Sequence, residues 1–73
     1  VLSRVRPLLP ANAVVRGIEP QDGGFMLTLR GLSKQDGEAL VNTFNTAGGF
    51  RQATVNMFFI GADYNETRIR FFY

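Results

Sequence analysis

The stretch Phe25-Met26-Leu27-Thr28-Leu29-Arg30 alternates apolar side chains with polar or flexible ones. Because successive side chains of a strand point to opposite faces of a sheet, the odd-numbered residues are predicted to be buried and the even-numbered ones exposed. The Asp22-Gly23 pair just before it is typical of a tight hairpin turn, which requires positive φ angles. The stretch is therefore predicted to be a half-buried strand that pairs backwards with residues 14–19.

A helical pattern follows this strand. Ser33 is predicted to cap a helix through its side-chain oxygen, and Asp36 lies in the first turn, where a carboxylate favours the positive end of the helix dipole. The apolar stripe comprises Leu40, Val41, Phe44 and Ala47. The helix is predicted to cover residues 34–47 and to end at Gly48-Gly49 in left-handed conformation. Gly37 lies on the same stripe and either permits close approach to the sheet or is simply tolerated.

Three further strands are predicted. Residues 14–19 alternate imperfectly, and a bulge at Gly17 would restore their pattern. Residues 50–60 form a long strand, and residues 67–73 close the chain as the last one. One face of the long strand is expected to carry Ala53, Val55, Met57 and Phe59, and the other Thr54, Asn56, Phe58 and Ile60. In the last strand, Ile69, Phe71 and Tyr73 are expected to point inward.

The opening residues predict a second, amphipathic helix. Its apolar positions recur at helical spacing and are Val1, Leu2, Val5, Leu8 and Leu9. Pro7 interrupts the hydrogen-bond ladder unless it lies in a first turn, and Pro10 ends the helix. The chain begins without Met or a polar tail, and we expect it to be a fragment of a longer protein.

The order of elements predicts an α+β fold. Two helices and four strands, each with one buried face, are expected to form a two-layer sandwich with both helices on one face of a four-stranded antiparallel sheet. All 73 residues are expected to form one domain. The αββαββ order becomes the ferredoxin-like βαββαβ order when the last strand is moved to the front. A circularly permuted ferredoxin-like domain has its second and fourth strands at the centre of the sheet.

The composition disfavours an enzyme. The chain contains neither cysteine nor histidine, so it lacks the commonest general base, the commonest transition-metal ligand and any thiol nucleophile. Two carboxylate pairs, Glu19 with Asp22 and Asp63 with Glu66, lie at predicted turns, where contact with solvent denies them the burial that acid catalysis needs. We therefore expect no catalytic residue, no cofactor-binding residue and no metal ligand. The net charge of +2 is compatible with ordinary solubility.

Basic side chains gather on the predicted solvent face of the sheet. They are Arg16, Arg30, Arg68 and Arg70, with Phe58 and Phe72 as candidate neighbours. Arginines interleaved with aromatic residues on an open four-stranded sheet suggest an RNA-recognition-like domain that binds single-stranded nucleic acid. The glycine-aromatic signature of that module is absent, because Leu32 follows Gly31. The simpler interpretation is a hydrated strand face, and nucleic acid is not the expected partner.

The whole pattern resembles the C-terminal periplasmic domain of the PilN and general secretion pathway protein L family. The resemblance extends from Leu8 to Tyr73: Leu8-Leu9-Pro10 precedes a valine-rich strand, Asp22-Gly23-Gly24 leads into the alternating strand, and a capped helix, Phe50 and two strands follow. It implies a permuted ferredoxin-like domain, tethered by an upstream segment to the bacterial inner membrane. There such a domain pairs with itself or with a sister subunit to build the platform of a type IV pilus or a type II secretion system.

The expected function is non-catalytic protein–protein interaction. Surplus apolar surface at residues 1–9 and 57–60, and the unpaired backbone groups of an edge strand, favour a symmetric dimer or a pair with a sister ferredoxin-like subunit. The residues expected to bind the partner are Leu2, Val5, Leu9, Val14, Met57, Phe58 and Ile60.

Overall fold

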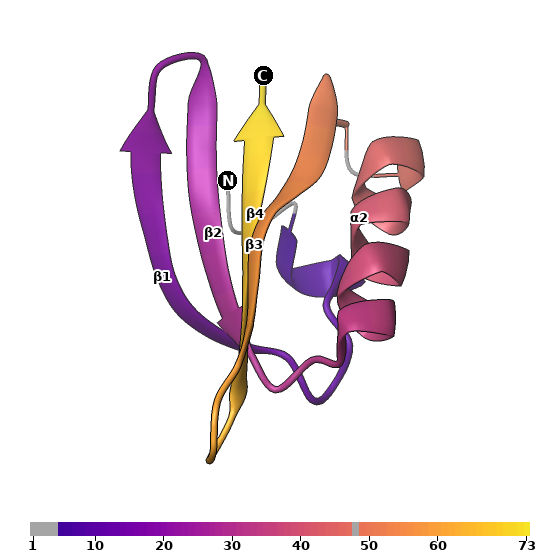
Figure 1. Ribbon diagram of the computed structural model, residues 1–73. Helices are drawn as coiled ribbons and strands as arrows, with labels where there is room; N and C mark the ends of the chain where they lie inside the picture. Colours follow the sequence, from indigo (N-terminus) through magenta and orange to yellow (C-terminus); the bar gives the residue numbers. More distant parts are fainter. Residues whose placement is uncertain (1–4, 48) are drawn as a thin grey trace.

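A computed structural model describes residues 5–47 and 49–73. Within these residues the fold is α+β, and the α-helix α2 lies along one side of a four-stranded antiparallel sheet (Figure 1). The elements in chain order are the 3₁₀ turn η1 (Arg6–Leu8), β1 (Val14–Gln21), β2 (Gly24–Arg30), α2 (Lys34–Ala47), β3 (Gln52–Ile60) and β4 (Asn65–Phe72).

The strands lie in the order β1-β2-β4-β3, and each pairs antiparallel with its neighbours. The prediction that the second and fourth strands are central is confirmed. β2 alternates as expected, because its three odd-numbered residues are buried. Across the central pair, Leu27 lies opposite Ile69 and Phe25 opposite Phe71. The two phenylalanine rings stack 4.5 Å apart, so the core is built on the β2–β4 ladder.

The predicted hairpin and bulge of the first strand are both confirmed. Gly23 has a φ of +73°, and β1 pairs with β2 through this turn. The register shifts between Val15 and Gly17, which places Val15 and Ile18 over core residues of β2. A β-carbon at Gly24 would overlap the carbonyl oxygen of Phe71, so this position requires glycine.

α2 has the predicted bounds and the predicted cap. Ser33 Oγ accepts a hydrogen bond from the Asp36 N–H at 3.1 Å. Gly49 has a φ of +75°, which agrees with the predicted left-handed stop, whereas Gly48 lies outside the described residues. The buried stripe of the helix is Gly37, Leu40, Val41 and Phe44. Ala47, predicted to lie on this stripe, is exposed.

The second predicted helix is not seen among the residues that the structure describes. Residues 1–4, and with them Val1 and Leu2, lie outside the described residues. In the rest of the opening segment, Val5 has helical backbone angles and the 3₁₀ turn η1 follows it. Pro7 cannot donate a backbone hydrogen bond, and Leu9, which precedes Pro10, is already extended at φ −76° and ψ 136°. The segment still contributes to the core, since Val5 is fully buried and Leu9 packs against it.

The faces of β3 change halfway along the strand. Ala53 and Val55 share one face, as predicted, and they lie opposite the core residues Phe71 and Ile69. A bulge between Val55 and Met57 then shifts the register by one residue, so Phe58 lies opposite the buried Thr67. The predicted faces of the second half are therefore wrong: Phe58 and Ile60 share the helix side of the sheet, and Met57 and Phe59 the open side.

The last residue also differs from its prediction. Tyr73 was expected to point inward, but it follows the end of β4 and is exposed. Its backbone N–H donates to the Gly23 carbonyl, and its ring lies 6.0 Å from that of Phe25.

Candidate interaction surface

β3 is an edge strand that contains a bulge but lacks two other usual protections against pairing. Its nine residues, Gln-Ala-Thr-Val-Asn-Met-Phe-Phe-Ile, include neither a charge nor a proline. Val55, Phe59 and Ile60 are 39%, 51% and 72% exposed. The opposite edge, β1, carries Arg16, Glu19 and Pro20 in addition to its bulge. Of the two edges, β3 is therefore the one suited to accept another strand.

Asn45 covers one end of this edge. Its side-chain amide donates to the Ala53 carbonyl at 2.9 Å, and its side-chain oxygen accepts from the Ala53 N–H at 2.7 Å. Both backbone groups of Ala53 therefore point away from β4, and the Asn45 side chain occupies the place that a neighbouring strand would take.

Among the described residues, no other side chain forms a hydrogen bond to the backbone of β3. At the other end of β3, the Gly61 N–H donates to the Tyr64 carbonyl at 2.9 Å, so Gly61 faces inward toward the hairpin partner. In an antiparallel ladder, residues alternate between inward and outward backbone groups, with the bulge adding one residue. The backbone groups of Val55, Phe58 and Ile60 consequently point away from β4.

A pocket of about 300 Å³ lies on the helix side of this open segment. Val55 and Phe58 of β3, Thr67 of β4 and the first turns of α2 line it. Lys34 and Glu38 of α2 belong to the lining and are both exposed. Among the described residues, the buried Thr67 hydroxyl has no hydrogen-bond partner, and Gly37 of α2 lies close to it. The pocket is largely apolar where the edge strand is open.

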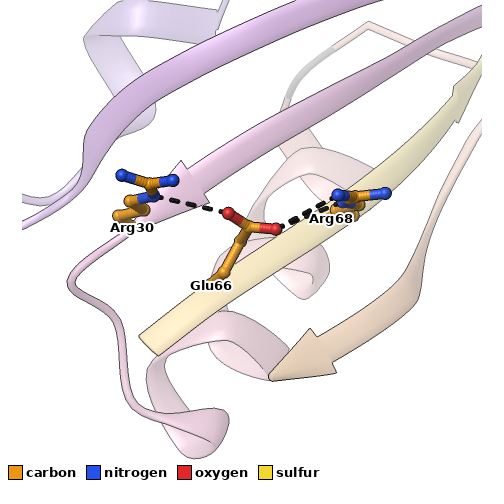
Figure 2. Close-up of polar contacts among 3 residues, drawn as sticks. All are labelled: Arg30, Glu66 and Arg68. Atoms are coloured by element: carbon orange, nitrogen blue, oxygen red, sulfur yellow. Dashed lines mark hydrogen bonds and ion pairs between the residues drawn. The ribbon is translucent and has the colours of Figure 1, made fainter. Parts of the chain in front are cut away.

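The open face of the sheet carries the predicted arginines, and a carboxylate holds two of them. Glu66 lies between Arg30 and Arg68, with its Oε1 3.3 Å from Arg30 Nε and its Oε2 3.3 Å from Arg68 Nη2 (Figure 2). The sequence placed Glu66 in a polar turn, which is wrong, because β4 already begins at Asn65 and the Glu66 side chain is only 13% exposed.

The other arginines of this face differ in their contacts. Arg70 donates to the carbonyls of Asp22 and Phe71, and its guanidinium lies 4.4 Å from the centre of the Phe72 ring. Arg16 is exposed. Phe58, proposed as an aromatic neighbour of the arginines, lies on the other side of the sheet. Three of the four guanidinium groups are thus engaged within the domain.

The predicted partner-binding residues do not form one surface. Leu2 lies outside the described residues, Val5 is buried in the core and offers no surface, and Leu9 packs against the core. Val14 is exposed on the opposite edge, β1. Met57, Phe58 and Ile60 come together on β3. Sequence reasoning missed Asn45, Lys34 and Glu38, whose relevance depends on where α2 crosses the edge of the sheet.

No family model matches the chain, and neither the curated proteins nor the solved structures give a match. Within the described residues, no helix is long and apolar enough to cross a membrane.

Proposed function

We propose that this chain is a non-catalytic protein–protein interaction and assembly domain that accepts a further strand at β3. The observation that carries the proposal is the uncharged, proline-free edge, in which the backbone groups of Val55, Phe58 and Ile60 point away from β4. Strand addition gains affinity from main-chain hydrogen bonds and specificity from alternate side chains. The exposed apolar residues of β3 would supply the contact area.

The proposed setting is the inner-membrane platform of a type II secretion system or a type IV pilus, with the domain in the periplasm. The support is the resemblance in sequence together with the strand order. If β4 is moved to the front of the chain order while the sheet order β1-β2-β4-β3 is kept, the strands have the arrangement of a ferredoxin-like sheet, and this supports the permuted fold that the resemblance implies. A second copy or a sister subunit would be the partner.

Single-stranded nucleic acid binding has weaker support. An RNA-binding sheet needs basic groups free to reach phosphates and aromatic rings free to stack on bases. Here Glu66 neutralises part of the charge of Arg30 and Arg68, and Arg70 covers the Phe72 ring.

Light scattering on a pair of matched variants tests the proposal. The unmodified domain is expected to show a mass that rises above the monomer with concentration. Ile60→Lys places a charge on the β3 edge and should return the domain to a monomer, whereas Val14→Lys, the same kind of change on the β1 edge, should not. A monomer at every attainable concentration, or binding to single-stranded RNA that salt weakens steeply, would contradict the proposal.

A further inference from the structure

We infer that the strand accepted by β3 is the β3 of a second copy of this chain, antiparallel and related by a two-fold axis at Phe58. This inference rests on the proposed function and names its partner. The two four-stranded sheets would join into one sheet of eight strands, with both α2 helices on the same side.

The spacing of the outward backbone groups is symmetric about Phe58. Ile60 lies two residues after Phe58. Val55 lies three residues before Phe58, but one of the residues between them is the extra residue of the bulge, so Val55 is also two ladder positions from Phe58. In an antiparallel pair centred on Phe58, Ile60 of each copy therefore meets Val55 of the other. Each of these backbone positions offers a donor and an acceptor toward its counterpart.

Both ends of this strand pairing lie where further pairing is blocked or the strand itself ends. β3 ends at Ile60, where the chain turns at Gly61. The second copy's strand would therefore end opposite Val55, just before Ala53, whose backbone groups Asn45 already covers. The face pattern agrees as well, because Met57 would lie opposite Phe59 of the second copy, and both side chains are on the open side of the sheet.

The charges on α2 complement those of a second copy. Lys34 and Glu38 lie one helical turn apart on the stripe that continues to Asn45, and Asn45 reaches the β3 edge. Both residues line the same pocket as Phe58, so they lie near the level of the proposed axis. Rotation about that axis makes the two helices antiparallel and brings Lys34 of each copy opposite Glu38 of the other. A strand from an unrelated protein would not be expected to bring complementary charges opposite Lys34 and Glu38.

A mixing experiment with charge reversals tests the inference. Lys34→Glu gives a chain with two acidic residues at the axis, and Glu38→Lys gives one with two basic residues. Each variant alone should dimerise roughly tenfold or more weakly at low salt, because two attractive contacts become repulsive. Mixed in equal amounts, the two variants should form a heterodimer with nearly the original affinity, measured by light scattering and sedimentation. Asp36→Lys, on the opposite side of α2, is the control and should leave dimerisation unchanged.

Rescue by mixing separates this inference from an effect on the fold, since a variant that folds poorly would not be rescued by another. A dimer that Ile60→Lys dissociates but the reversals leave unchanged would keep the proposed function and overturn the two-fold arrangement. Loss of dimerisation by both reversals without rescue on mixing would also overturn it, as would tighter binding of β3 to a different protein's strand than to itself.

Discussion

Individual side chains on the two faces of β4 have opposite roles. On the open face, Glu66 accepts hydrogen bonds from Arg30 and Arg68, and Arg70 donates to backbone carbonyls near the hairpin turn. Through these contacts, three arginines of the open face bind partners within the domain. On the helix face, Thr67 is buried beneath Gly37, with its hydroxyl unpaired. A buried hydroxyl without a partner costs free energy that the rest of the core must offset.

Thr67→Val should increase the free energy of unfolding by about 1 kcal/mol. Valine has the shape of threonine and keeps the β-branched side chain that suits a strand, while it removes the unpaired polar atom. The measurement is urea-induced unfolding, with Thr54→Val on the open face as the control. A clear loss of stability would mean that the Thr67 hydroxyl does have a partner.

The elements differ in how far the sequence predicts them. The alternation of residues 25–30, the cap at Ser33 and the glycine after α2 are local signals, and the structure confirms each of them. The second half of β3 was assigned to the wrong faces, because one bulge residue shifts every later side chain to the other side of the sheet. Its sequence of apolar residues on both faces contains no mark of that shift.

The candidate surface was predictable only in part. The uncharged run Met57, Phe58 and Ile60 is visible in the sequence and lies at the open edge. Asn45, by contrast, is an unremarkable polar residue of a helix until the crossing of α2 over β3 brings it to Ala53. Such a contact depends on tertiary packing, so composition and periodicity carry no signal for it.

Asn45→Ala should lower the free energy of unfolding by about 1 kcal/mol, because two hydrogen bonds to Ala53 are lost and the higher helix propensity of alanine offsets only part of the loss. The same change uncovers the end of the edge and should increase aggregation at high concentration. Urea unfolding and turbidity measure the two effects. Asn42→Ala is the matched control, since Asn42 is exposed on the same helix. Equal behaviour of the two variants would contradict the role given to Asn45.

At the scale of the whole molecule, the domain is asymmetric in a way that favours assembly. One face of the sheet is covered by α2 and the opening segment, and the other carries the arginines of the open face. The β1 edge carries charges and a proline, whereas the β3 edge carries neither. A small domain buries a modest fraction of its surface, so joining two sheets at β3 would also stabilise each copy.

Amide hydrogen exchange along β3, followed as a function of protein concentration, tests the central claim most directly. The N–H groups of Val55, Phe58 and Ile60 should exchange rapidly in dilute protein and become protected as the concentration rises. The N–H of Ala53, which Asn45 already binds, should be protected throughout and serves as an internal control. Exchange at Val55, Phe58 and Ile60 that is equally fast at every concentration would contradict strand addition at this edge.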